Sequence, residues 1–116
     1  MNAVTLYHNP RCSKSRQALA LLRSRNVEPE IIEYLQTPPP VAELERILKL
    51  LSMEPRELMR KKESAYDDLA LDDESLDRHS LLRAMVEHPS LIERPIVVAN
   101  GRAVLGRPPE NILDVL

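Results

Sequence analysis

The sequence predicts an α/β fold built on a small mixed β-sheet, with a helical segment inserted between the two halves of the sheet. Three observations support this prediction. Residues 3–35 follow a strand–helix–strand pattern, the last twenty or so residues (about a fifth of the chain) contain two strand-like runs joined by Asn100–Gly101, and apolar residues at helical spacing fill the stretch between. A chain of 116 residues has room for one domain, so we expect residues 1–116 to form a single domain with its helical insertion at about residues 41–88.

The first half of the sheet is expected from two strands and the helix between them. Residues 3–7 alternate apolar and polar side chains, and residues 30–35 form a second apolar run. Pro10 lies in the turn that follows the first strand, and residues 13–25 carry leucines and alanines at helical spacing among basic residues. A helix of this length between two strands predicts a right-handed crossover, so the two strands are expected to be parallel.

The inserted segment is predicted to be mainly helical. The prolines at 38–40 end the second strand, and residues 41–51 are amphipathic with a helical period. Pro55 begins a short helix, because proline is tolerated in the first helical turn. Residues 67–71 are expected to form a turn or short helical piece, and residues 73–87 a further helix.

The second half of the sheet is predicted from a hairpin signal. Residues 96–99 and 103–105 are apolar, and Asn100–Gly101 between them favours a two-residue turn. Residues 108–116 are expected to form a short amphipathic helix. A parallel strand pair beside an antiparallel hairpin is the layout of a thioredoxin-like sheet.

Composition excludes several classes of function. The chain has no Phe or Trp, only three Tyr and a formal charge of −2, which is unfavourable for stacking on bases or binding a phosphate backbone. No apolar run approaches the roughly 20 residues of a membrane-spanning helix. We therefore expect a cytoplasmic protein that binds neither nucleic acid nor membrane.

The single cysteine is the strongest candidate for chemistry. Cys12 falls at the first turn of a predicted helix, where the N–H groups of residues 13–15 and the helix dipole favour a thiolate. Donors and positive charge are added nearby by His8, Arg11, Lys14 and Arg16. A buried, inert cysteine is the alternative, but a polar and basic setting favours a reactive thiol.

Ser15 stands where a Cys-x-x-Cys motif has its second cysteine. A serine hydroxyl can donate a hydrogen bond to a thiolate but cannot resolve a mixed disulfide, so an external thiol, such as glutathione or a redoxin, is required. A metal site is not expected, because the chain has one cysteine and its three histidines share no ligand spacing.

Several separated motifs resemble the glutaredoxin-coupled arsenate reductases. The active-site loop of that family has the pattern H-N-P-x-C followed by two residues and S-R, and residues 8–16 of this chain read H-N-P-R-C-S-K-S-R. Similarity continues through residues 32–39, Arg60–Lys61, residues 88–98 and Arg107–Pro108. The resemblance therefore extends over essentially the whole chain, in the same order.

This resemblance implies a mechanism and a set of site residues. The Cys12 thiolate is expected to attack arsenate, after which glutathione adds and glutaredoxin reduces the mixed species to release arsenite. Glutathione is thus a co-substrate, and no bound cofactor is expected. The oxyanion is expected to be bound by three arginines that match Arg60, Arg94 and Arg107, and the thiolate to be stabilised by His8 and Ser15. Pro95 is expected in the cis form beside the cysteine.

Two alternatives remain open at this level. Arg11 and Ser13–Lys14 replace the small residues that studied members carry around the cysteine, which leaves the substrate uncertain. The chain could instead be a redox-regulatory binding protein of the same fold, like the regulator that docks on RNA polymerase. It could also be a general glutathione-dependent thiol reductase with no use for oxyanions.

Overall fold

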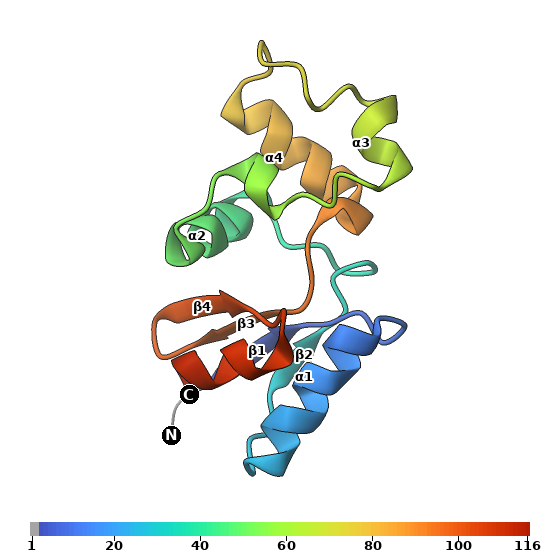
Figure 1. The fold of residues 1–116 in the computed structure, drawn as a ribbon. Helices are drawn as coiled ribbons and strands as arrows, with labels where there is room; N and C mark the ends of the chain where they lie inside the picture. Colours follow the sequence, from blue (N-terminus) through green and yellow to red (C-terminus); the bar gives the residue numbers. More distant parts are fainter. Residues whose placement is uncertain (1–2) are drawn as a thin grey trace. The chain divides into compact units, whose positions relative to one another are not determined.

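A computed structural model describes residues 3–116 of the chain (Figure 1). The contacts divide these residues into two compact units. We call the first the sheet unit, which comprises the described residues up to Thr37 together with Arg94–Leu116. We call the second the helical unit, which is Pro38–Glu93.

The sheet unit contains the predicted mixed sheet. Its four strands lie in the order β2-β1-β3-β4 and are β1 (Val4–Tyr7), β2 (Glu30–Ile32), β3 (Ile96–Ala99) and β4 (Arg102–Leu105). The β1 strand pairs in parallel with β2 and antiparallel with β3, so that Leu6 stands opposite Ile31 on one side and Val97 on the other. The antiparallel β3–β4 pair completes the sheet, which confirms the prediction of a parallel strand pair beside an antiparallel hairpin.

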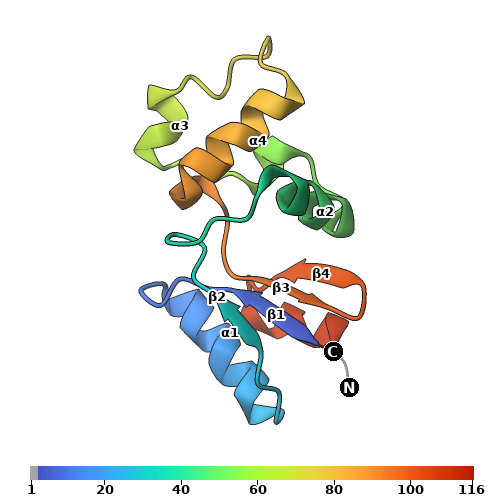
Figure 2. The same cartoon turned by 180° about the vertical axis from the view of Figure 1, so that it is seen from behind.

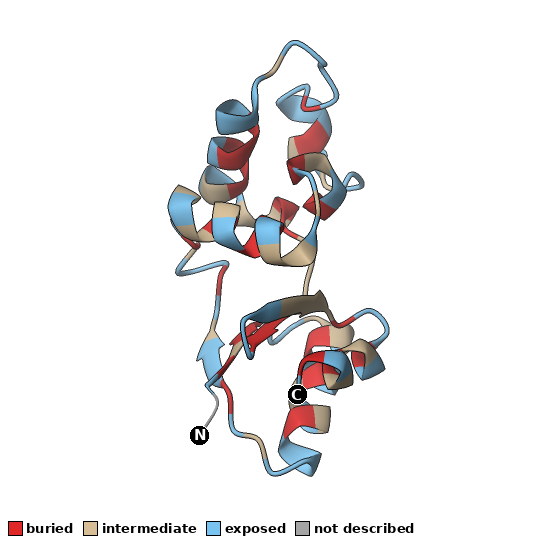
Figure 3. Ribbon diagram, turned by 90° about the vertical axis from the view of Figure 1, so that its left-hand side faces the viewer, coloured by how far each residue is buried: buried red, intermediate tan, exposed pale blue. Residues whose placement is uncertain are grey.

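Two helical segments pack on one face of this sheet, namely α1 (Ser13–Ser24) and the 3₁₀ helix η3 (Pro109–Val115) (Figure 1). Alternate residues of a strand point to the same face of the sheet, and on this face those residues of β1 and β3 are apolar. The core between the layers is formed by eight buried side chains, those of Val4, Leu6, Ala18, Leu22, Val97, Ala99, Ile112 and Val115. Figure 3 shows in red that buried residues occur both on the sheet and on the helical segments. Two basic residues of α1, Arg16 and Arg23, are exposed, and the third, Lys14, is partly buried.

The turn between β3 and β4 has the conformation that its sequence predicts. Both central residues have positive φ, 56° at Asn100 and 70° at Gly101. Asparagine and glycine tolerate this left-handed region, which a two-residue hairpin turn of this type requires. The side chain of Asn100 also donates to the carbonyl of Val115 at 2.7 Å, so the hairpin is tied to the C-terminal helix.

The β2 strand is shorter than the predicted 30–35. It ends at Ile32 because the backbone N–H groups of Gln36 and Thr37 both bond to the Glu33 carbonyl, at 3.0 and 2.9 Å, and close a turn. Tyr34 lies in this turn rather than in the strand, and its side chain is only 1% exposed.

The helical unit has three α-helices, α2 (Val41–Leu51), α3 (Ser64–Asp68) and α4 (Arg78–Glu87), and two 3₁₀ turns, η1 (Pro55–Leu58) and η2 (Pro89–Leu91) (Figure 2). The α2 and α4 helices contact each other. The unit is closed by an isolated antiparallel bridge between Met59 and Ile92. Its interior is apolar, and the fully buried side chains there are those of Leu44, Ile47, Leu48, Leu58, Leu82, Met85, Leu91 and Ile92.

The α4 helix begins at Arg78, so the prediction of a helix from residue 73 was wrong for residues 73–77. The Asp77 carboxylate caps the helix by accepting from the Ser80 N–H at 2.8 Å. Upstream, the Asp73 carboxylate accepts from both the N–H and the hydroxyl of Ser75. Such local side-chain bonds compete with helix formation. The helix therefore begins only after its N-cap residue, Asp77.

Within residues 3–116, no helix is both long enough and apolar enough to cross a membrane.

Candidate active site around Cys12

The loop between β1 and α1 is held by its own backbone and side-chain bonds. The His8 N–H bonds to the Ile32 carbonyl at 2.8 Å and extends the β1–β2 pairing by one step. Asn9 then closes the turn, because its side-chain oxygen accepts from the Arg11 N–H at 3.0 Å and its carbonyl from the Cys12 N–H at 3.0 Å. The loop therefore places Cys12 as the residue that caps α1, with extended backbone angles.

The Cys12 sulfur is half-buried and receives several hydrogen bonds. Partial burial raises the pKa of the thiol, which by itself would oppose ionisation. Hydrogen bonds from the N–H groups of Ser15 and Lys14, and from the guanidinium of Arg94, lower it by more. The net result is a cysteine whose pKa lies below its ordinary value, as expected for a sulfur at a helix N-terminus beside a cation.

Ser15 and His8 form a buried pair behind the cysteine. The Ser15 hydroxyl is fully buried, lies 2.5 Å from His8 Nδ1 and accepts from the Asn9 N–H at 3.1 Å. Thus the hydroxyl binds His8 and the loop backbone, while it is the Ser15 N–H that bonds to the Cys12 sulfur. The pair fixes the loop around the helix N-terminus.

The electrostatics of His8 favour a neutral ring. Burial lowers its pKa most, the Glu33 carboxylate partly opposes this, and Arg23 and Arg16 lower the pKa further. A ring that is neutral near pH 7 can take either tautomer against the Ser15 hydroxyl. His8 therefore holds Ser15 without adding a full positive charge at neutral pH.

Arg94 is the cation that reaches the sulfur from elsewhere in the sequence. It lies just before β3, and the Arg94–Pro95 bond is cis, as the resemblance predicted. Its half-buried guanidinium bonds to the Cys12 sulfur and also interacts with Tyr34. The Nε atom of Arg94 is buried and has no hydrogen-bond partner among the residues described. The site thus contains a cationic donor that these residues leave unsatisfied.

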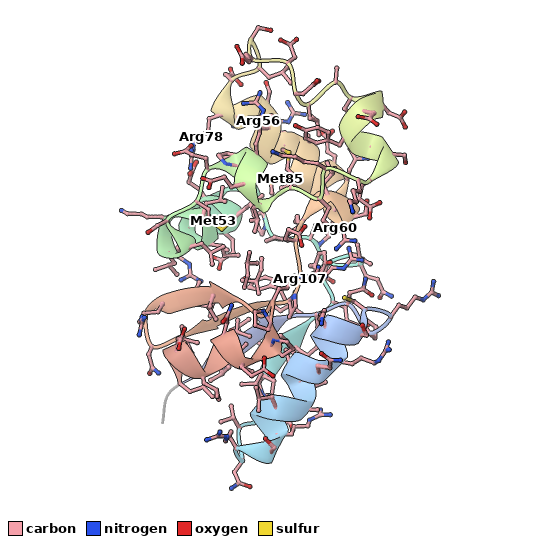
Figure 4. The ribbon with its side chains drawn as sticks, in the orientation of Figure 1. Met53, Arg56, Arg60, Arg78, Met85 and Arg107 are labelled. Carbon is pink, nitrogen blue, oxygen red and sulfur yellow. The ribbon has the colours of Figure 1, made fainter. Side chains whose placement is uncertain are left out.

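Arg107 lies close to Arg94 within the sheet unit. Its Nη1 approaches the Arg94 carbonyl at 3.5 Å, and its side chain is exposed (Figure 4). The Arg107–Pro108 bond is also cis. Gly106 precedes it, and a Cβ there would lie 2.8 Å from the Pro95 ring, so only glycine fits without a shift.

Arg60 belongs to the helical unit, where its partners are carboxylates (Figure 4). Its Nε lies 3.3 Å from Glu63 Oε1, and its Nη1 lies 3.8 Å from Glu93 Oε2. Its N–H bonds to the Leu91 carbonyl at 2.6 Å. Of the residues named from sequence, the structure brings Cys12 together with Ser15 and Arg94, and His8 joins them through Ser15. Arg107 contacts the Arg94 carbonyl, and Arg60 lies in the helical unit.

Two residues of the site were missed by sequence reasoning. Asn9 was treated only as part of a turn, although its side chain is 7% exposed and closes the cysteine loop. Tyr34 was assigned to a strand, and only its hydroxyl, a polar atom in an apolar run, could have indicated a contact with the site. No group of three or more side chains suited to metal binding occurs in the described part of the chain.

The sequence and the structure are both similar to those of known proteins. Residues 7–115 match the model of the ArsC family. The chain is 50% identical over 117 aligned positions to an arsenate reductase of Neisseria meningitidis serogroup A, with all of both chains covered. It is 55% identical over 114 positions to the uncharacterized protein YfgD of Escherichia coli K12, covering 97% of this chain and 96% of that one. The solved structure of the arsenate reductase from Vibrio cholerae superposes with a TM-score of 0.96 at 52% identity over 98% of each chain, which confirms the thioredoxin-like fold.

Proposed function

The chain belongs to the ArsC family, and on this premise we propose that it is an arsenate reductase that uses the Cys12 thiolate, with glutathione and glutaredoxin as its source of electrons. Two relatives that it matches along nearly their whole length, from Neisseria meningitidis and Vibrio cholerae, are named arsenate reductases. We place the reaction in the cytoplasm, where glutathione is abundant.

In the proposed reaction, the two electrons that reduce arsenate come from two external thiols. The Cys12 thiolate displaces one oxygen of arsenate as water and forms an arsenic–sulfur bond. The thiol of one glutathione displaces a second oxygen. A further thiol, delivered by glutaredoxin, attacks the glutathione sulfur, so that arsenic gains two electrons while the two external thiols become a disulfide. Water then releases arsenite and regenerates Cys12. In total, arsenate and two thiols give arsenite, one disulfide and one water.

The observation that carries the proposal is the Arg94 guanidinium. It bonds to the Cys12 sulfur, and its buried Nε still lacks a partner among the described residues. A planar guanidinium binds two oxygens of a tetrahedral oxyanion at once, and its charge is permanent. An arsenate oxygen bound to this donor would lie beside the sulfur that attacks the arsenic.

The other proposed site residues support Cys12 and Arg94 by binding the oxyanion or by stabilising the thiolate. Arg107 is the second oxyanion ligand, supported by its contact with the Arg94 carbonyl. Arg60 is the third, on the family resemblance alone. His8 and Ser15 stabilise the thiolate by holding the loop, and the absence of a second cysteine makes the external thiol necessary.

A coupled assay tests the proposal. Purified protein, arsenate, glutathione, glutaredoxin, glutathione reductase and NADPH should give arsenate-dependent loss of NADPH. The loss should vanish in Cys12→Ser and when glutaredoxin is omitted, and it should fall steeply in Arg94→Ala.

The same assay separates the two alternatives. Rapid turnover of a glutathionylated peptide that survives Arg94→Ala, without arsenate reduction, would identify a general thiol reductase. Binding to purified RNA polymerase that depends on the oxidation state of Cys12, again without turnover, would identify a regulatory protein. Either result would contradict the proposed function.

A further inference from the structure

Tyr34 is a buried tyrosine that the proposed chemistry does not use. Its side chain is 1% exposed, and it is the largest of the fully buried side chains described. Burying a phenol oxygen is unfavourable unless the oxygen finds a polar or charged partner. A phenylalanine would fill the same space without that cost, so the hydroxyl requires an explanation of its own.

The polar group that interacts with this side chain is the Arg94 guanidinium, whose own Nε is buried and has no hydrogen-bond partner among the residues described. Tyr34 and Arg94 interact through their side chains, and the phenol oxygen favours the positive charge of the guanidinium. The same guanidinium bonds to the Cys12 sulfur. Three groups thus lie in series, with the phenol oxygen at one end, the thiol at the other and the cation between them.

The backbone holds both ends of this series in place. Tyr34 follows β2 directly, in the turn that the Gln36 and Thr37 N–H groups close on the Glu33 carbonyl. Cys12 follows β1, and β1 and β2 are paired, with one further bond from the His8 N–H to the Ile32 carbonyl. Arg94 comes from a third segment and has a long, flexible side chain, so its direction is not determined by its own backbone.

We infer that Tyr34 is a positioning residue: its phenol oxygen accepts a hydrogen bond from the Arg94 guanidinium and keeps that group turned toward the Cys12 sulfur. The hydroxyl touches neither the thiol nor the oxyanion in this role. It acts through Arg94, because a guanidinium anchored at one edge loses less freedom when its other edge binds a thiolate or an oxyanion.

The test is the pH dependence of Cys12 alkylation in Tyr34→Phe. The rate of reaction with iodoacetamide follows the thiolate fraction, so its midpoint reports the thiol pKa in the folded protein. We expect the midpoint to move to higher pH and the rate near pH 6 to fall by about three- to tenfold, the change that half a unit to one unit of pKa produces. Tyr66→Phe is the matched control, since it removes the hydroxyl of a buried tyrosine in the helical unit, and it should leave the rate unchanged.

A double-mutant cycle shows whether the effect passes through Arg94. In an Arg94→Ala background, Tyr34→Phe should cause no additional shift, because the group that it positions is gone. An unchanged midpoint in Tyr34→Phe alone would overturn the inference. So would an equal shift in both backgrounds, which would indicate a general effect on packing.

The inference rests on the proposed function for its purpose, but alkylation requires no arsenate. A shift in Tyr34→Phe that depends on Arg94 supports the positioning role even if the coupled assay shows no turnover. A wild-type enzyme that reduces arsenate, together with a silent Tyr34→Phe, would remove the positioning role and leave the function in place. Protection of Cys12 by inorganic phosphate gives a second readout, and Tyr34→Phe should require several-fold more phosphate for half-protection.

Discussion

The two units of the chain bury different kinds of side chain. In the sheet unit, three polar residues around the Cys12 loop, His8 and Asn9 in the loop and Ser15 in the first turn of α1, are almost fully buried and bond to one another or to the loop backbone. Among the residues described in the helical unit, the buried side chains are aliphatic, methionine, proline or tyrosine. None of its charged residues is buried, and the exposed Arg78 pairs with Glu45 and Glu54 (Figure 4).

Buried side chains therefore have different roles in the two units. Apolar burial stabilises the helical unit and tolerates no polar group without a partner. Polar burial in the sheet unit is costly unless each group is bonded, and the bonds available hold the loop that presents a thiolate. The sheet unit is therefore where substitutions should alter the reactivity of Cys12. In the helical unit, apart from the proposed oxyanion ligand Arg60, substitutions should alter mainly stability.

The largest effect on stability is expected in the helical core. Leu82 on α4 is 1% exposed, so Leu82→Ala leaves a cavity and should lower the free energy of unfolding by about 2–5 kcal/mol, measured by urea titration. Leu69→Ala, at an exposed position, should change it by less than about 0.5 kcal/mol. Under native conditions the alkylation rate of Cys12 should stay at the wild-type value. A lower alkylation rate of Cys12 in folded Leu82→Ala would contradict the conclusion that the helical core affects mainly stability.

The next largest effect is expected at Arg94. Arg94→Ala removes a hydrogen bond and a positive charge from the Cys12 sulfur, so the thiol pKa should rise. We expect the alkylation rate at pH 6.5 to fall by about tenfold, which is one unit of pKa. Arg25→Ala, at the C-terminal end of α1, is the matched control and should react like wild type. Equal rates in the two variants would show that Arg94 does not support the thiolate.

A smaller effect is expected from the pH dependence of stability at His8. Burial lowers the pKa of His8, so the unfolded chain binds a proton at higher pH than the folded protein does. This contribution to stability is complete above the unfolded pKa of about 6.5 and is lost as the pH falls toward the folded value, by about 1.4 kcal/mol per unit of depression. Urea midpoints between about pH 7.5 and 5.5 should therefore fall less in His8→Gln than in wild type. His79→Gln, at an exposed position, should keep the wild-type slope.

The smallest effect is expected at the end of α2. Ser52 caps this helix with φ of 56°, a left-handed conformation that favours glycine. Ser52→Gly should raise the free energy of unfolding by about 0.5 kcal/mol, the difference between relieved strain and the added freedom of the unfolded chain. Ala42→Gly, within the same helix, should lower it by about 0.5–1 kcal/mol. Two changes of the same sign would contradict this conformational explanation.

Local patterns predicted most of the fold and the centre of the site. The Asn100–Gly101 hairpin, the helix at residues 41–51 and the place of Cys12 at the start of α1 are all confirmed. Two boundaries were wrong, at residues 33–35 and 73–77, because bonds to the Glu33 carbonyl and the carboxylates of Asp73 and Asp77 compete with regular structure. Such competition depends on single hydrogen bonds, which periodicity does not register.

The sequence by itself determined the groups that lie within a few residues of Cys12, because short-range backbone geometry connects them. The N–H groups of Lys14 and Ser15, and the His8–Ser15 pair, follow from one loop and the first turn of one helix. Only the tertiary structure brought the Arg94 guanidinium to the sulfur and the Tyr34 hydroxyl to that guanidinium. Three segments distant in the sequence meet there through strand pairing in the sheet, and no local pattern encodes which side chains then face one another.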